Sequence, residues 1–298
     1  MLRRVVVALV SLGVLIGAGS PTANAADASA VGVAPAVSAA AARADHDRGG
    51  EYLALGDSVP FGYNPLLPVG SDASRYVGYP ELLARRLDLR LTNLSCPGQT
   101  ASGFGSLSGT DNGCFPFRSL AALHTPYSRT QLDAALSFLR SHPRTRLVTI
   151  MIGANDLLLC AHSTADGCTS PAEVGGVLAS VGADLTATLK EIRKVYSGPL
   201  VAVSYYATNF ADKPSVAAIG ALNGVVAQVT TAFGGRVADS FTPFERRSAG
   251  HGGSACSAGL LIRLPAGLGC DIHPSPAGAG VLAEAVVRAL PRERRAAA

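Results

Sequence analysis

Four short segments, far apart in the chain, end on residue types that acyl-transfer chemistry needs. They are Gly56-Asp57-Ser58, Pro97-Gly98, Gly153-Ala154-Asn155-Asp156 and Asp271-Ile272-His273-Pro274. Together they supply a serine nucleophile, a histidine base, and backbone and side-chain N–H donors that could stabilise an oxyanion. Each segment alone is also common as a turn or a helix cap. The chemistry is therefore indicated by the set rather than by any one member.

His273 is the best candidate for the general base. It precedes Pro274 and the last predicted helix, on the side of the sheet where Ser58 is expected. The other histidines are predicted to lie in the leader, at the surface or in a loop: His46, His124, His142, His162 and His251. The Gly-x-Ser-x-Gly elbow of α/β-hydrolases is absent around every serine, so the serine and histidine belong to a different architecture.

Strands and helices that position these residues alternate five times along the chain. Short apolar runs predict strands over 52–55, 89–94, 147–152, 200–205 and 236–238. Amphipathic spacing predicts helices over 79–87, 130–140, 171–196, 215–233 and 276–290. Gly- and Ser-rich stretches predict loops over 102–125 and 248–269. This alternation indicates an α/β fold with a parallel sheet covered on both faces.

Ser58, Gly98 and Asn155 each follow directly after one of the first three predicted strands. Ligands of such sheets bind beyond the carboxyl ends of the strands. Topology therefore predicts that these three residues meet at one edge of the sheet.

The N-terminal residues are predicted to be an export signal and a leader, and the last residues a short tail. Two arginines, an apolar stretch and Ala23-Asn24-Ala25 predict a signal peptide over 1–25, and hence a secreted protein. An N-terminal membrane anchor is the alternative, and the arginine pair leaves Sec or twin-arginine export open. An Ala-rich leader is predicted over 26–50, one domain over 51–290 and a tail over 291–298. No later stretch is judged apolar enough to cross a membrane, so no stable membrane insertion is expected.

The charge of the chain bears on whether it binds nucleic acid. The net charge is only +4, and no basic stripe is interleaved with aromatics, so nucleic acid is not expected as a partner.

Six cysteines in an exported chain indicate disulfides, and six cysteines can pair in 15 ways. Their spacing forms three local pairs: Cys96 with Cys114, Cys160 with Cys168, and Cys256 with Cys270. A metal site is the rival interpretation, but no Cys-x-x-Cys cluster is present.

The four segments resemble those of the SGNH/GDSL hydrolases, most closely their secreted actinobacterial esterase and lipase branch. The matching blocks are Leu55-Gly56-Asp57-Ser58-Val59, Cys96-Pro97-Gly98-Gln99-Thr100, Ile152-Gly153-Ala154-Asn155-Asp156 and Ile272-His273-Pro274. The resemblance implies a three-layer α/β/α, flavodoxin-like fold whose five-stranded parallel sheet has the order 2-1-3-4-5. It implies Ser58 as nucleophile, His273 as base, and an oxyanion hole from the Ser58 N–H, the Gly98 N–H and the Asn155 side chain. It also implies three sequential disulfides.

The resemblance further implies a secreted serine esterase or lipase that needs no metal or organic cofactor. Its substrate would be a small-molecule or lipid ester, and the chain is expected to be a monomer. A carbohydrate O-deacetylase and a phospholipase of the same fold are the alternatives, and an inactive secreted binding module is the rival outside enzymes. Acyl preference is expected to depend on loops 59–78, 101–126 and 243–269.

The sequence departs from the family pattern at one position. Family members usually carry Asp three residues before the histidine, whereas here that position is Cys270 and Asp271 is two residues before His273. Some members of the secreted branch orient the histidine with a main-chain carbonyl instead. We favour the carbonyl of Cys270 over the side chain of Asp271 as the partner of His273.

Overall fold

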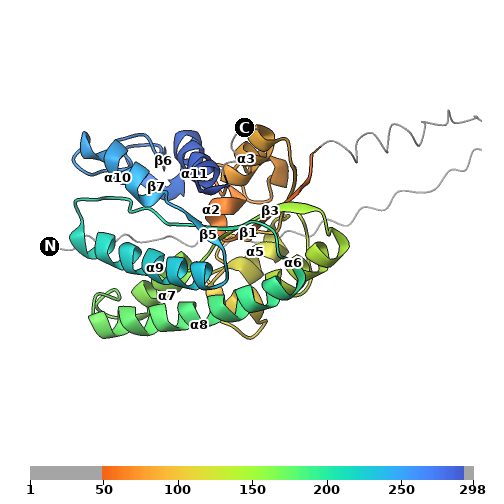
Figure 1. Ribbon diagram of the computed structural model, residues 1–298. Helices are drawn as coiled ribbons and strands as arrows, with labels where there is room; N and C mark the ends of the chain where they lie inside the picture. The colour runs from red at the N-terminus through yellow and green to blue at the C-terminus, as the bar shows by residue number, and fades with distance from the viewer. Residues whose placement is uncertain (1–48, 292–298) are drawn as a thin grey trace, which may run out of the picture.

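The protein is described by a computed structural model over residues 49–291 (Figure 1). The predicted signal peptide over 1–25 lies outside the described residues. So do all but the last two residues of the predicted leader over 26–50, and all but the first residue of the predicted tail over 291–298.

Five parallel strands form the main sheet, in the order β2-β1-β3-β4-β5 that the resemblance implied. The strands are β1 (Glu51–Gly56), β2 (Arg90–Asn93), β3 (Thr145–Met151), β4 (Leu200–Val203) and β5 (Arg236–Ala238). Nearly every residue of β1, β3 and β4 is buried. Strands buried on both faces are what an apolar run without alternation predicts.

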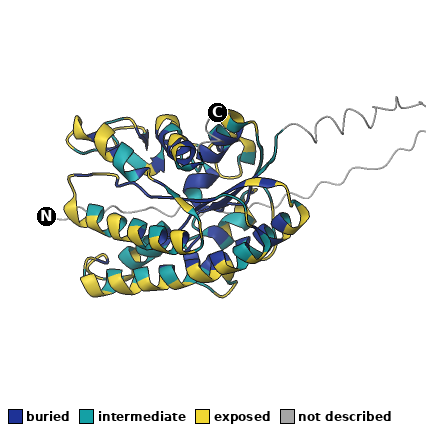
Figure 2. Ribbon diagram, viewed as in Figure 1, coloured by how far each residue is buried: buried dark blue, intermediate teal, exposed yellow. Residues whose placement is uncertain are grey.

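Helices cover both faces of this sheet (Figure 1). On one face lie α3 (Tyr79–Leu87) and α11 (Pro276–Ala289), which contact each other; on the other lie α6 (Gln131–Ser141), α8 (Pro171–Val195) and α9 (Lys213–Ala232). Figure 2 shows the exposed residues of α8 and α9 on their outer faces and buried residues gathered around the sheet. The three-layer α/β/α prediction is therefore confirmed.

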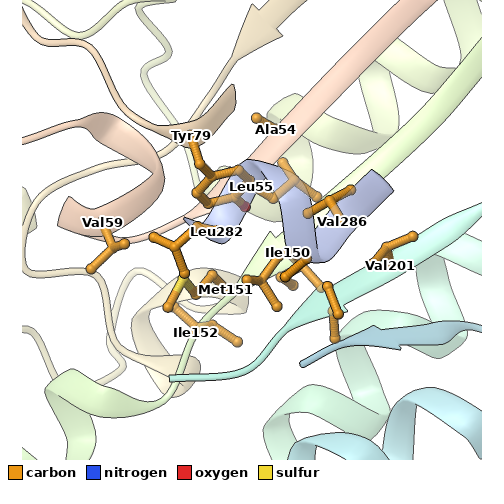
Figure 3. Packing of buried hydrophobic residues seen from close by; sticks show 14 of the residues in the cluster. Ala54, Leu55, Val59, Tyr79, Ile150, Met151, Ile152, Val201, Leu282 and Val286 are labelled. Carbon is orange, nitrogen blue, oxygen red and sulfur yellow. The ribbon is translucent and has the colours of Figure 1, made fainter. Parts of the chain in front are cut away.

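The core joins the sheet to these layers through large apolar side chains. Figure 3 shows Leu282 and Val286 of α11 among Leu55 of β1 and Ile150 and Met151 of β3. All five side chains are at most 1% exposed. Burying a side chain of this size contributes roughly 1.5–3 kcal/mol, so the contacts that close the sheet are also the ones that stabilise it.

Several shorter elements were not predicted, and most of them lie near the carboxyl ends of the strands. They are α2 (Ser58–Phe61), the 3-10 helix η1 (Ala73–Arg75), α4 (Ala101–Gly105), α5 (Cys114–Leu120), α7 (Ala154–Ser163), α10 (Phe241–Ala249), β6 (Leu261–Arg263) and β7 (Cys270–Pro274). Strands β6 and β7 pair antiparallel as a separate hairpin. Their segments carry too few residues for a periodic pattern, and they take their form from caps and from pairing with distant residues.

Helix α9 corrects one expectation about membranes. Within the described residues it is the one helix whose length and mean hydropathy of 1.3 would allow it to cross a membrane. The sequence analysis found no such stretch after the N-terminus. In the structure α9 packs on β4, β5 and α8, with Leu222, Val226 and Thr230 as its buried residues.

Candidate active site

Ser58 lies immediately beyond the carboxyl end of β1, as the first residue of α2. Asp57 caps this helix, and its carboxylate Oδ1 accepts a hydrogen bond from the N–H of Val59 at 2.9 Å. Gly56 makes the turn possible, because its φ is +131° and a Cβ there would lie 2.0 Å from the carbonyl oxygen of Met151. Only glycine fits this position, so the strand passes directly into the helix that presents the serine hydroxyl.

The side-chain amide of Gln131, in α6, holds the same turn. The N–H of Gly56 donates to Oε1 at 2.6 Å, and Nε2 donates to the carbonyl oxygen of Gly56 at 2.9 Å. The amide thus satisfies both backbone groups of Gly56 as a neighbouring strand would. Gln131 was predicted to lie in a helix but not to act at the site, because nothing in its spacing points to a partner 75 residues away.

His273 reaches Ser58 from β7, 215 residues later in the chain. Its Nε2 lies 2.8 Å from Ser58 Oγ, which is hydrogen-bonding distance. The imidazole is buried, and the ring of Tyr63 packs against it with the centroids 4.9 Å apart. The structure thus brings together the side chains predicted as nucleophile and base.

The partner of His273 Nδ1 is the side chain of Asp271, not the main-chain carbonyl of Cys270 that was favoured from the sequence. Oδ1 of Asp271 contacts Nδ1 of His273 and also accepts the backbone N–H of His273 at 3.0 Å. The expectation of a Cys270 carbonyl treated this segment as a loop, whereas residues 270–274 form β7. Side chains two residues apart in a strand share a face, so Asp271 lies beside His273. Cys270 pairs with Arg263 of β6 instead.

The charge state of Asp271 suits that contact. Burial by itself would raise the pKa of its carboxyl group, but the hydrogen bond from His273 and the charge of the imidazolium lower the pKa below its usual range. The carboxylate therefore stays ionised where it can stabilise a positive charge on the ring.

Two backbone donors lie free at this edge of the sheet. Among the described residues, neither the N–H of Ser58 nor the N–H of Gly98 has a hydrogen-bond acceptor. Gly98 has a φ of +81°, and a Cβ on it would lie 2.2 Å from the carbonyl oxygen of Asn112. The turn after β2 thus requires glycine at this position.

Asn155, in the first turn of α7, links the loops that carry these donors. Its Nδ2 donates to the carbonyl oxygen of Gln99 at 3.0 Å and lies 3.4 Å from Oδ2 of Asp57. Its Oδ1 accepts a hydrogen bond from Nδ2 of Asn112 at 2.8 Å. The side chain is 5% exposed, so these partners fix the amide beside Ser58.

Asp57 is a buried carboxylate at the centre of this arrangement. The hydroxyl of Tyr205, which follows β4, donates to its Oδ2. Burial raises the pKa of Asp57 to about 6, against the opposing effect of the Tyr205 hydrogen bond. Tyr205 could not be predicted as a site residue, because a tyrosine at the end of a predicted strand carries no signal of a polar partner.

A cavity of about 920 Å³ extends from Ser58 and His273 between α7, α8 and α9. Most of its wall is apolar, with Leu157, Leu158, Val174, Leu178 and Ile219 among the lining residues. The loops expected to shape the acyl site, 59–78, 101–126 and 243–269, contribute only Val59 to the wall. Helices α8 and α9, which were predicted only to cover the sheet, form the cavity together with α7, which was not predicted.

The six cysteines pair as their spacing suggested: Cys96–Cys114, Cys160–Cys168 and Cys256–Cys270. Disulfides of this kind form in oxidising compartments. Among residues 49–291 no group of three His, Cys, Asp or Glu side chains could hold a metal ion.

One other histidine departs from its predicted place. His124 was expected at the surface, but its side chain is 13% exposed and its Nε2 lies 2.9 Å from the carbonyl oxygen of Phe61.

Solved structures with this fold include several ester hydrolases. A phospholipase A1 from Streptomyces albidoflavus has a TM-score of 0.54 at 21% identity, over 81% of this chain and 100% of that chain. An extracellular lipase from Streptomyces rimosus has a TM-score of 0.52 at 20% identity, over 81% of this chain and 100% of that chain. An acetylxylan esterase from Geobacillus stearothermophilus has a TM-score of 0.51 at 18% identity, over 80% and 94%. At such identities the likeness shows the fold alone.

A search of curated proteins finds no match. The model of the GDSL-like lipase/acylhydrolase family matches residues 54–281, a range that includes all four segments with which the sequence analysis began. The chain therefore belongs to the GDSL-like lipase/acylhydrolase family, and it is a hydrolase of carboxylic esters.

Proposed function

We propose that the protein hydrolyses esters through an acyl-enzyme on Ser58, with His273 as general base and Asp271 as the third member of the triad. The observation that carries the proposal is the 2.8 Å contact between Ser58 Oγ and His273 Nε2, with the Asp271 carboxylate on the opposite nitrogen. Ser58 Oγ would attack the ester carbonyl while its proton passes to His273 Nε2. The imidazolium would then give that proton to the leaving alcohol as the ester C–O bond breaks.

Deacylation would follow the same route with water as the nucleophile. His273 would take a proton from water, the hydroxide would attack the acyl carbon, and the proton would return to Ser58 Oγ as the acid leaves. The oxyanion formed in both steps would be bound by the N–H groups of Ser58 and Gly98 and by the side chain of Asn155. Within residues 49–291 the two backbone N–H groups have no hydrogen-bond acceptor, which supports this assignment.

We further propose that the natural substrate carries a long apolar acyl chain. The cavity beside Ser58 has a volume of about 920 Å³ and walls of leucine, valine, isoleucine and alanine, far more room than an acetyl group fills. Each buried methylene contributes about 0.8 kcal/mol, so kcat/KM should rise with chain length until the cavity is full. The cavity favours a lipase or phospholipase over a carbohydrate O-deacetylase.

The nucleophile is tested by labelling with a fluorophosphonate, followed by peptide mapping. We expect the label on Ser58, and we expect Ser58→Ala to lose both label and activity. Ser102→Ala, which removes a hydroxyl in α4, four residues after Gly98, should keep both. Labelling at Ser102 or Ser254 would overturn the assignment.

The substrate class is tested with p-nitrophenyl esters from acetate to palmitate and with acetylated xylan. We expect kcat/KM to increase at least about tenfold from acetate to octanoate. Higher activity on acetate or on acetylated xylan would favour an O-deacetylase instead.

Secretion is part of the proposal, supported by the charged and apolar N-terminal pattern and by the three disulfides. N-terminal sequencing of the protein recovered outside the cell should begin at Ala26. Recovery of the full chain in the membrane fraction would support the anchor alternative.

A further inference from the structure

We infer that Asn112 is a positioning residue that sets the orientation of the Asn155 amide and the path of the Gly98 turn. The inference rests on the proposed function, because it requires Asn155 to act as an oxyanion donor. Asn112 lies between α4 and α5, two residues before Cys114, whose disulfide with Cys96 closes this segment. The sequence analysis predicted only a long loop here and gave Asn112 no role.

The side chain of Asn112 is one of three groups that set the orientation of the Asn155 amide, and among them it is the hydrogen-bond donor. Nδ2 of Asn112 donates to Oδ1 of Asn155 at 2.8 Å, while Nδ2 of Asn155 faces two acceptors, the Gln99 carbonyl and the Asp57 carboxylate. A flipped Asn155 amide would set its oxygen against those two acceptors and its nitrogen against the Asn112 donor. Together with those two acceptors, Asn112 therefore disfavours the orientation in which an oxygen, rather than an N–H group, would face an oxyanion.

The main chain of Asn112 contacts Gly98, whose N–H group is another of the proposed oxyanion donors. Its N–H donates to the carbonyl oxygen of Gly98 at 3.1 Å, and its own carbonyl oxygen packs so closely on Gly98 that no Cβ fits between them. One residue thus contacts two of the three groups proposed to bind the oxyanion.

Two features keep Asn112 in place. The carboxylate of Asp111 accepts the N–H groups of Gly113, Cys114 and Phe115 at 3.2, 2.9 and 3.2 Å, which anchors the start of α5. The Cys96–Cys114 disulfide ties the same point to the segment that carries Gly98. The position is therefore rigid on both sides, as a residue that orients another must be.

Asn112→Asp is the decisive variant. An ionised carboxylate only accepts hydrogen bonds, so it favours the flipped Asn155 amide and turns the donor away from the oxyanion. Loss of one oxyanion donor costs about 10²–10³ in kcat, and we expect a decrease of about 10- to 100-fold with KM changed less than about threefold. Asn112→Ala removes the donor without introducing an acceptor and should lose only about two- to tenfold.

The pH dependence separates orientation from general loop damage. A protonated carboxyl group can donate to Oδ1 of Asn155 again, so the ratio of kcat for Asn112→Asp to kcat for the wild type should rise as pH falls. Ionisable groups near Asn155 include Asp111 in the loop of Asn112, Asp57 at α2 with its partner Tyr205 after β4, Asp156 in α7 and His273 in β7. They are present in both proteins, so their own titration largely cancels in the ratio.

A double-mutant cycle completes the test. In an Asn155→Ala background, Asn112→Asp should cost less than about twofold, because its effect passes through the missing amide. Asn209→Asp, an exposed change that adds the same charge and keeps the hydrogen bond to Ala211 N–H, should leave kcat unchanged. Far-UV circular dichroism checks that each variant folds; if Asn112→Asp does not, the cycle is run with Asn112→Ala.

An equal cost of the Asn112 variant in both backgrounds would overturn the inference, as would a ratio that stays flat with pH. Those results leave the proposed function standing if Asn155→Ala itself loses activity. Full activity of Asn155→Ala would instead refute the proposed oxyanion role, and the inference with it.

Discussion

Asp271 and His273 occupy alternate positions of β7, and Ser58 meets His273 from the end of β1. The carboxylate therefore touches one nitrogen of the imidazole and the serine hydroxyl touches the other. A hydrogen bond to an ionised group is roughly twice as strong as a neutral one. Asp271 is thus better suited than a carbonyl to stabilise the imidazolium that would form if His273 acts as the proposed general base.

Replacing Asp271 with Asn tests this reasoning. Asp271→Asn keeps the shape of the side chain but loses the charge, and we expect kcat to fall at least about 100-fold, toward the roughly 10⁴ of a triad acid. Asp88→Asn serves as the control, because Asp88 is exposed and its φ of +52° is one that Asn also adopts. A loss of less than about tenfold for Asp271→Asn would mean that another acceptor orients the ring.

The raised pKa of the buried Asp57 carboxyl group predicts how the stability of the protein depends on pH. Its pKa in the folded protein is about 6, above the usual 3.8, so between these values the folded state holds a proton that the unfolded state has released. Stability contributed by this group is present at low pH and is lost as pH rises through about 6. The shift of about two units corresponds to about 3 kcal/mol.

Urea unfolding of the wild type and of Asp57→Asn at pH 4.5 and 7.5 measures this effect. Because Asn does not titrate, the free energy of unfolding of the variant minus that of the wild type should be larger at pH 7.5 than at pH 4.5. A difference that is the same at both pH values would contradict the raised pKa of Asp57.

At the scale of elements, α7, α8 and α9 serve two purposes. They pack on one another, α7 and α9 against α8 and α9 also against β4 and β5, and their residues line the cavity beside Ser58. Gly175 of α8 lines this cavity and Gly176 does not, yet a Cβ on either residue would meet nothing within 4 Å. The two neighbouring glycines therefore form a matched pair for testing the cavity.

Gly175→Phe should fill part of the cavity without a backbone clash. We expect kcat/KM to fall at least about tenfold for p-nitrophenyl palmitate and to change less than about twofold for the acetate. Phenylalanine has a higher helix propensity than glycine, so neither Gly175→Phe nor the control Gly176→Phe should unfold the protein. Gly176→Phe should leave the whole chain-length profile unchanged, and a parallel loss in that variant would place the acyl chain elsewhere.

For the whole molecule, each disulfide closes a short loop near the site rather than joining the layers of the fold. The paired cysteines are 18, 8 and 14 residues apart, beside Gly98, in the cavity wall and beside Asp271. A loop of this length contributes roughly 2–4 kcal/mol by restricting the unfolded chain. The sheet itself depends on the buried core of β1, β3 and β4.

Titration with a reductant should therefore abolish activity before it unfolds the sheet. We expect the hydrolysis rate to fall at reductant concentrations where the far-UV circular dichroism signal is unchanged, because the loops that hold Gly98 and Asp271 loosen first. Activity and ellipticity that decline together would show that the disulfides support the whole fold.

The sequence by itself determined the elements whose patterns are local. Long apolar runs such as 147–152 and amphipathic stretches such as 171–196 predict β3 and α8 to within two residues, because burial on a sheet or a helix face repeats along the chain. Alternation of these elements predicts a parallel sheet and one edge for Ser58, Gly98 and Asn155. The cysteine pairs could also be predicted, since each pair is close in sequence.

Only the tertiary structure decided what depends on distant neighbours. Asp271 lies beside His273 because β6 pairs with β7 and makes the segment a strand, and that pairing has no signature in five residues. Gln131, Tyr205 and Asn112 take their roles from partners 75, 148 and 43 residues away. The cavity likewise arises from how α7, α8 and α9 pack together, which the apolar pattern of each helix alone does not specify.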